Sequence, residues 1–157
     1  NLLPKKTSDK KTLVLDLDEN LVHSQFQPFD VPSDITLKIE LEDELHDIHV
    51  LVRPGVKEFL ENMGKIYEIV IFTASVSKYA DPLLDILDKN KNCKFRLFRE
   101  HCTPINTCFV KEIKKLGREL KDIVIVDNST REDECKSFYD LGVSDSKISI
   151  IKPIDNI

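Results

Sequence analysis

The chain has 157 residues, of which 41% are hydrophobic and 32% charged, and its formal net charge is -5. This length and composition are typical of one soluble globular domain with its own core. Lysines and arginines are scattered, which disfavours direct nucleic-acid binding, and no apolar run approaches the roughly 18 residues of a membrane helix. We therefore expect a single domain over residues 1–157 with a loose lead-in over 1–11. The four cysteines form no CxxC pair, which predicts reduced thiols in an intracellular protein and argues against a zinc site.

The first half of the chain alternates apolar runs with helical patterns. Continuous apolar residues are typical of strands that are covered on both faces, and they occur at 12–17 and 67–72. Alternation of apolar and polar residues predicts a β-hairpin over 35–52. Helical spacing predicts one helix over 56–63 and another that begins just after Thr73 and is kinked or restarted at Pro82.

The second half continues the alternation. The predicted elements are a strand over 94–98, a short helix over 110–116 ended by Gly117, a buried strand over 123–126, a polar helix over 131–141 and a last strand over 148–151. This order predicts an α/β fold, with a mainly parallel sheet flanked by helices. The only elaboration is the small β-hairpin inserted after the first strand, and no large cap domain is expected.

Polar side chains follow three of the apolar runs. Asp16 and Asp18 close the first, Thr73 follows the second, and Asp127 with Asn128 follows the third. Open parallel sheets bind ligands at the carboxyl ends of their strands, so we expect these groups to converge. Side chains two apart in a strand share a face, so the first two carboxylates would repel each other without a cation.

Carboxylates and an amide are hard oxygen donors, and together they predict a Mg²⁺ site. The helix that begins after Thr73 would offer N–H groups to a phosphate on that metal. A lysine would complete the charge balance, and spacing alone leaves the choice open among Lys111, Lys114, Lys115 and Lys121. The constellation predicts phosphoryl transfer, with a carboxylate nucleophile that forms an aspartyl-phosphate.

At this point the chain resembles a known family. DLDENLVHS is similar to the DxDxT signature of the haloacid-dehalogenase (HAD) superfamily, and more narrowly to the FCP/SCP-type (NLI-interacting-factor-like) phosphatases of the RNA polymerase II C-terminal domain. The matching blocks cover nearly the whole chain to Ser129 and are LVRPGVKEFLENMG, YEIVIFTASVSKYADPLLDILD, FRLFRE, FVKEIKKLGREL and IVIVDNS. The resemblance implies a HAD-like, Rossmann-like fold and a Mg²⁺-dependent serine/threonine protein phosphatase. Its partner would be a phosphoserine or phosphothreonine peptide, such as the polymerase C-terminal domain, in the nucleus or alternatively the cytoplasm.

The resemblance also implies a role for each catalytic residue. Asp16 would be the nucleophile and a metal ligand. Asp18 would be the general acid and base, with its main-chain carbonyl on the metal. Thr73 would hold the phosphate, and Lys111 would neutralise it.

Further roles follow from the same resemblance. Asn128 would complete the metal shell, with Asp127 beside it. Phe26 and Tyr79 match an aromatic pocket that reads a proline near the phosphoserine, and Arg99 matches a basic residue near the substrate phosphate. Taken without the resemblance, the two aromatic residues would simply pack and the arginine would form a surface ion pair.

The chain also departs from the family pattern. Asn20 stands where the family nearly always has Thr, Ser129-Thr130 replaces Ser-Pro, and residues 131–147 are unlike the family's link to its last strand. These differences concern activity and substrate choice more than fold. The alternative is a non-catalytic binding module of the import-translocase or scaffold type. The intact catalytic set favours the enzyme, and Asn20 is the one residue that favours the module.

Overall fold

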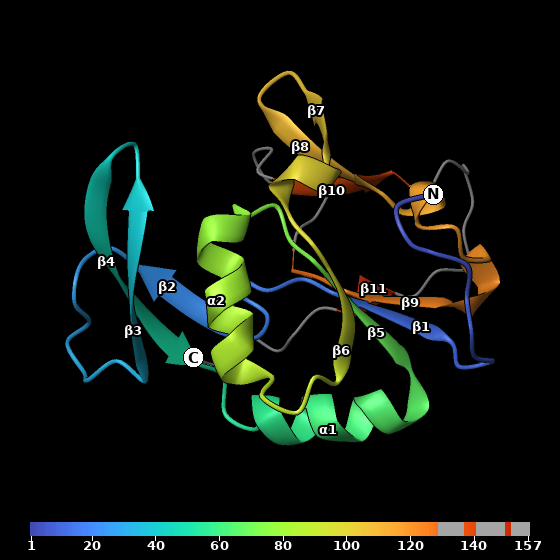
Figure 1. Cartoon of the computed structure of the whole chain (residues 1–157), viewed down its shortest axis with the longest axis horizontal. Coiled ribbons are helices and arrows are strands. Elements are labelled where there is room, and N and C mark those ends of the chain that lie inside the picture. The colour runs from blue at the N-terminus through green and yellow to red at the C-terminus, as the bar shows by residue number, and fades with distance from the viewer. Residues whose placement is uncertain (129–136, 141–149, 152–157) are drawn as a thin grey trace.

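The computed structural model describes residues 1–128, 137–140 and 150–151. A five-stranded sheet crosses the centre of the molecule, and all its neighbouring strands are parallel (Figure 1). In spatial order the strands are β11 (Ile150–Ile151), β9 (Ile123–Val126), β1 (Thr12–Leu15), β5 (Glu68–Phe72) and β6 (Cys93–Leu97). The predicted α/β fold with a mainly parallel sheet is therefore confirmed.

Both faces of this sheet are buried. Leu13 and Leu15 point to the face that is covered by α1 (Val56–Ile66) and α2 (Ser77–Leu87). Val14 points to the opposite face and packs with the 3₁₀ turn η2 (Ile113–Leu116). Residues 1–11 form no helix or strand, yet Leu3 is buried in this second cluster. Because β1 is covered on both sides, its sequence is apolar without alternation.

A second sheet is inserted between β1 and α1. It is antiparallel, and its strands β2 (Val22–Gln25), β4 (Glu44–Val52) and β3 (Ile35–Leu41) lie in that order. Figure 1 places this sheet beside α2, at the left of the view. The expected hairpin is present as β3 and β4. The strand β2 was missed because its sequence VHSQ buries only its first residue and shows no alternation.

The starts of the two long helices, α1 and α2, can be compared with the predicted ones. Gly55 precedes α1 with φ +84, a left-handed conformation that glycine adopts without strain, and the chain turns there from the end of β4 into α1. The helix α2 is continuous through Pro82, so no restart occurs there. It begins at Ser77, so the expected helix start directly after Thr73 is wrong.

The region after β6 differs most from the prediction. Residues 110–116 are not one helix, because β8 (Cys108–Glu112) precedes the turn η2 and pairs with β7 (Thr103–Ile105) and β10 (Ser137–Asp140). The predicted polar helix over 131–141 is wrong for residues 137–140, which form the strand β10. The remainder of that prediction lies outside the described residues. Two further 3₁₀ turns are η1 (Arg99–His101) and η3 (Leu120–Asp122).

Two smaller expectations are also tested by the structure. Cys93 and Cys102 are buried free thiols, whereas Cys108 is disulfide-bonded, so the expectation of reduced thiols is wrong there because spacing alone does not reveal pairing. Among the described residues, no helix is long and apolar enough to cross a bilayer.

A buried ion pair ties the start of β5 to the segment after η2. Arg118 donates from Nε to Glu68 Oε2 at 2.7 Å and from Nη2 to Oε1 at 3.0 Å, and the Thr12 hydroxyl donates to Oε2 at 3.0 Å. Burial raises the pKa of Glu68, but these hydrogen bonds outweigh it and hold the pKa below its usual value. The pair therefore stabilises the fold above the ordinary pKa of a glutamate and loses this effect as the pH falls through the lowered value.

Glu68→Gln is expected to destabilise the protein at pH 7 by about 3 to 5 kcal/mol, because it leaves the buried Arg118 without a carboxylate. The difference from wild type should shrink as the pH is lowered below the ordinary glutamate value. Urea denaturation at neutral and acidic pH measures both effects. The exposed Glu40→Gln is the control and should change little. A difference for Glu68→Gln that stays constant across this pH range would contradict the prediction.

Candidate active site

The predicted strand ends do lie together. Leu15 in β1 is paired with Ile71 in β5 and with Val126 in β9, so β1 is the central one of the three strands. The residues that follow these strands therefore emerge at one edge of the sheet: Asp16 and Asp18, Thr73, Asp127 and Asn128. The convergence expected from the sequence is confirmed.

A tight turn after β1 brings the side chain of Asn20 next to that of Asp16. Glu19 adopts φ 62, a left-handed conformation, and its N–H donates to the Val22 carbonyl at 2.8 Å. The Leu21 N–H donates to the Leu17 carbonyl at 2.9 Å. The chain therefore reverses within the sequence DLDEN, and the side chain at position 20 points back toward position 16.

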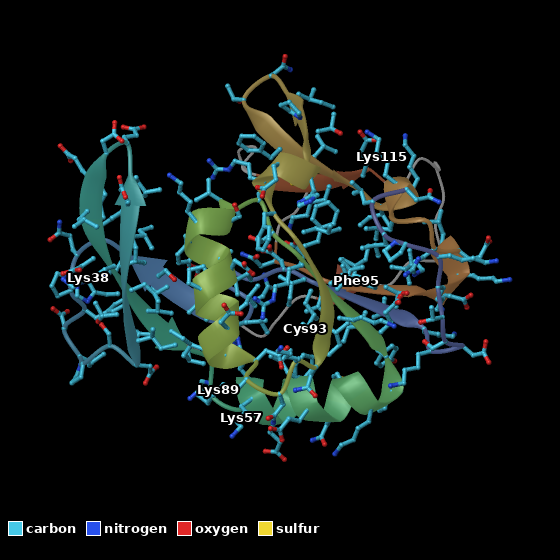
Figure 2. All side chains as sticks on the ribbon, in the orientation of Figure 1. Lys38, Lys57, Lys89, Cys93, Phe95 and Lys115 are labelled. Carbon is cyan, nitrogen blue, oxygen red and sulfur yellow. The ribbon has the colours of Figure 1, made fainter. Side chains whose placement is uncertain are left out.

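Lys111 lies between two buried carboxylates. Its ammonium donates to Asp16 Oδ1 at 2.9 Å and to Asp127 Oδ2 at 2.8 Å, and its side chain is fully buried. Lysines normally lie at the periphery, as Figure 2 shows for Lys38 and Lys115. Burial lowers the pKa of Lys111, but the two carboxylates outweigh it and the pKa is raised. The buried ammonium is therefore charged, and among the four lysines left open by spacing Lys111 contacts Asp16.

Asp16 is ionised against the cost of its own burial. Burial raises its pKa to about 6, while the charge of Lys111 opposes that rise and the charge of Asp127 adds to it. Its second oxygen, Oδ2, accepts from the Asn20 amide at 3.1 Å. Both oxygens are therefore fixed, and the group is a carboxylate at neutral pH, as a nucleophile must be.

The carboxyl group of Asp18 has different partners. Oδ2 accepts from the Ser75 hydroxyl at 2.6 Å, and Oδ1 accepts from the Tyr79 hydroxyl at 2.9 Å. Tyr79 also shares a short hydrogen bond with Ser24, and burial together with the charge of Asp18 raises its pKa. The sequence argument expected a cation to relieve repulsion between the carboxylates of Asp16 and Asp18. In the structure, hydrogen bonds from separate donors already stabilise each of them.

Three oxygen atoms converge on one point beside Asp16. The amide nitrogen of Asn20 lies at this point, 3.1 Å from Asp16 Oδ2, 3.1 Å from the Asp18 carbonyl and 2.8 Å from Asn128 Oδ1. A carboxylate, a main-chain carbonyl and an amide oxygen are hard ligands that suit Mg²⁺. Within the described residues, no three His, Cys, Asp or Glu side chains gather as a metal cluster. A metal here would therefore depend on the carbonyl and the amide as well as on one carboxylate.

A pocket of about 470 Å³ opens beside Asp18. Its lining brings together all three predicted substrate-binding residues, Phe26, Tyr79 and Arg99. Phe26 is 56% exposed, whereas Tyr79 is buried. Arg99 stacks its guanidinium over the Phe109 ring at 4.7 Å, and its Nε donates to the Ala74 carbonyl.

Thr73 is buried at the end of β5 and does not cap a helix. Its N–H donates to the Leu97 carbonyl at 3.0 Å, and its hydroxyl oxygen accepts from the Ser75 N–H at 3.1 Å. The loop between β5 and α2 is therefore held by the threonine itself. Its place beside Asp16 follows from the pairing of β5 with β1, and its role as a phosphate ligand stays a prediction.

Comparison with protein-family models decides the family. Residues 11–137 match the model of the NLI interacting factor-like phosphatases, and this span contains every candidate residue of the site. The chain belongs to the NLI interacting factor-like phosphatase family.

Curated relatives of this NLI interacting factor-like domain are themselves named phosphatases. It is 51% identical over 131 residues to phosphatase PSR1 of Saccharomyces cerevisiae, covering 82% of this chain and 30% of that protein. It is 50% identical over 121 residues to phosphatase Herzog of Drosophila melanogaster, covering 76% and 34%. It is 47% identical over 131 residues to the human CTD small phosphatase-like protein, covering 82% and 47%. The chain thus spans less than half the length of these relatives.

A solved structure has a similar fold. It is Fcp1, described as an essential RNA polymerase II CTD phosphatase, with a TM-score of 0.65 and 19% identity. The match covers 76% of this chain and 38% of Fcp1. At this identity the likeness concerns the fold alone, and it confirms the HAD-like fold expected from the sequence.

Sequence reasoning missed two residues of this NLI interacting factor-like site. Ser75 was not singled out, although its hydroxyl donates to Asp18. Asn20 was noted only as a departure, although its amide contacts three oxygens. The position of Ser75 two residues after Thr73 was a usable signal, because both follow the same buried strand. No local signal predicts the contacts of Asn20 with Asn128, which is far away in the sequence.

Proposed function

We propose that this NLI interacting factor-like domain is a magnesium-dependent serine/threonine protein phosphatase that acts through an aspartyl-phosphate. One observation carries the proposal. The buried carboxylate of Asp16 is charged and fixed by Lys111, and the carboxyl group of Asp18 stands two residues away at an open pocket. The names of the relatives support the reaction type. We propose an extended phosphopeptide as substrate, such as the RNA polymerase II C-terminal domain.

In the first step, a carboxylate oxygen of Asp16 attacks the phosphorus in line with the serine oxygen. The bond from phosphorus to that oxygen breaks, and Asp18, which enters this step in its protonated form, gives its proton to the leaving serine. The hydroxyl groups of Ser75 and Tyr79 orient the acid for this transfer. The buried ammonium of Lys111 offsets the charge that gathers on the phosphoryl oxygens.

In the second step, water attacks the phosphorus of the aspartyl-phosphate. The carboxylate of Asp18 takes the proton of this water, and the bond from phosphorus to Asp16 breaks. Inorganic phosphate leaves, and both carboxyl groups return to their starting forms. The same two residues therefore serve in both steps, with opposite proton transfers at Asp18.

The residues that would hold the metal are Asp16 through its carboxylate, Asp18 through its main-chain carbonyl and Asn128 through its amide oxygen. When bound, Mg²⁺ supplies positive charge that stabilises phosphoryl oxygens in the transition state. The pocket beside Asp18 would hold the peptide, with Phe26 against an apolar side chain and Arg99 near the phosphate. No part of the described chain closes over this pocket as a separate domain, which suits a peptide loop.

Hydrolysis of p-nitrophenyl phosphate and of a phosphoserine-proline peptide tests the proposal. We expect turnover of both in Mg²⁺ and loss of turnover in EDTA that is restored by added Mg²⁺. A folded protein that releases no phosphate from either substrate in Mg²⁺ would contradict the proposal and favour the binding module. Turnover that persists in EDTA would contradict the role of the metal alone.

Tyr79→Phe tests the orienting role of the tyrosine hydroxyl on Asp18. The change removes one hydrogen bond to the carboxyl group of Asp18 and keeps the aromatic ring in the pocket. We expect kcat/KM on the phosphopeptide to fall roughly 10-fold, the low end for loss of a partner that orients a functional group. Tyr67→Phe is the matched control, because Tyr67 ends α1 and contacts no residue of the site in the hydrogen bonds described. Equal activity of the two variants would show that the hydroxyl of Tyr79 does not orient Asp18.

A further inference from the structure

The amide nitrogen of Asn20 lies at the point where three oxygen atoms converge. Its nitrogen carries two hydrogens, whereas three acceptors surround it, from Asp16, Asp18 and Asn128. A neutral amide therefore cannot form three good hydrogen bonds at once. A cation has no such limit, because it attracts all three oxygens equally. The amide is thus a partial substitute for a cation at this point.

The other end of the same amide has no partner. Asn20 is 3% exposed, and its Oδ1 is buried without a hydrogen bond in the described structure. Leaving a buried acceptor unsatisfied is unfavourable. The conformation is nevertheless favourable, because the amide N–H groups of Asn20 stabilise three closely spaced oxygens. If a cation took the place of the nitrogen among the three oxygens, the Asn20 side chain would no longer be held there.

The amide and a metal exclude each other. Mg²⁺ binds oxygen ligands at roughly 2.0 to 2.1 Å, so it would have to occupy the space that the Asn20 nitrogen now fills. The main chain cannot carry the residue away, because Arg53 donates from Nε to the Asn20 carbonyl at 2.6 Å. The side chain can rotate, because a pocket of about 210 Å³ lined by Asn20, Asp16 and Phe59 adjoins it.

From these contacts we propose that Asn20 is an internal competitor for the metal, which must rotate out of the ligand set before Mg²⁺ binds. The proposal rests on the metal site of the proposed function. It gives the domain a weaker affinity for Mg²⁺ than the same ligands would have alone. It also makes the metal-free form more stable than it would be with three unopposed oxygens.

Calorimetric titration with Mg²⁺ tests the affinity directly. Asn20→Thr keeps a polar side chain but removes the amide, and we expect Kd for Mg²⁺ to fall by about 10-fold or more. Thermal melting gives a second readout. In EDTA the variant should melt below wild type, because Asp16 Oδ2 loses the amide of Asn20 as its donor. In Mg²⁺ it should gain more in Tm than wild type gains.

Asn92→Thr is the matched control. Its amide also donates to an aspartate four residues earlier, Asp88, at 2.9 Å, but this pair lies at the end of α2 away from the site. The control should lower Tm by the same amount in EDTA and in Mg²⁺ and leave the Kd for Mg²⁺ unchanged. Asn20→Ser repeats the test with a smaller side chain if Asn20→Thr does not fold.

The outcomes separate this inference from the proposed function. Unchanged or weaker Mg²⁺ affinity in the Asn20 variants would overturn the competitor role and leave the phosphatase intact. Failure of wild type and all variants to bind Mg²⁺ would overturn the metal site and the competitor role together. Tighter binding, with a lower Tm in EDTA, supports the inference.

Discussion

Asp16→Asn is expected to reduce turnover of p-nitrophenyl phosphate by at least roughly 10³-fold, because the amide cannot form the covalent intermediate. The fold should survive, since the new amide oxygen still accepts from Lys111. Burial raises the pKa of Asp16 to about 6, so in metal-free protein its ionisation opposes folding as the pH rises toward that value. The pH dependence of stability is therefore opposite in sign to that of Glu68. As the pH rises from acidic to neutral, the free energy of unfolding of wild type falls relative to that of Asp16→Asn.

Two measurements check this prediction. Steady-state kinetics in Mg²⁺ give the loss of turnover, and melting in EDTA across the same pH range gives the stability difference. Asp122→Asn is the control, because Asp122 lies in the turn η3 before β9 and outside the site. Full activity of Asp16→Asn in a folded protein would exclude Asp16 as the nucleophile.

Lys111→Met should be the most destabilising single change in the site. The ammonium is the shared donor of two buried carboxylates, and its removal leaves Asp16 and Asp127 facing each other without a charge between them. Breaking a buried ion pair in this way costs on the order of 3 to 5 kcal/mol. The pKa of Asp16 should also rise further, because the neighbouring positive charge that opposes its rise is lost.

The matched control for this change is Lys115→Met. Lys115 also forms an ion pair, with Glu112 at 2.8 Å, but it lies at the exposed end of η2. Exposed pairs contribute roughly 0 to 1 kcal/mol, so urea denaturation should show little change. Similar stability losses for the two lysine variants would mean that burial does not give Lys111 its importance. Turnover by Lys111→Met at the wild-type rate would remove Lys111 from the catalytic set.

Much of the fold could be predicted because its signals are local. The apolar runs that became β1, β5 and β9 are continuous, and strands covered on both faces leave that pattern. The segment around Val110 was misread because Val110, Ile113 and Leu116 are spaced like one helix face. In the structure Val110 belongs to β8, whose partners include β10. Pairing between distant strands leaves no mark in a short window of sequence.

The residues of the site also divide into those that local sequence predicts and those that it does not. Its strand-end residues were predicted from the residues alone, since parallel strands present their ends at one edge. Lys111 could be selected only from the family resemblance, because 95 residues separate it from Asp16 and no spacing rule connects them. The donors to Asp18 also lie far away in the sequence, as the separation of 61 residues from Tyr79 shows. Contacts that close such long loops depend on the whole fold.

The chain enters and leaves the inserted sheet, strands β2 to β4, at neighbouring positions. Val22 and Val52 are paired in the ladder, and the Arg53 N–H donates to the Leu21 carbonyl at 2.9 Å, so the two ends of the insertion are joined at its base. The entropic cost of closing this loop grows only slowly with its length, by roughly 0.6 kcal/mol for each doubling. Yet Phe26 and Ile39, from the insertion, form one wall of the pocket at Asp18. Under the proposed function, exchange or lengthening of this module would change substrate choice and leave the chemistry at the sheet edge as it is.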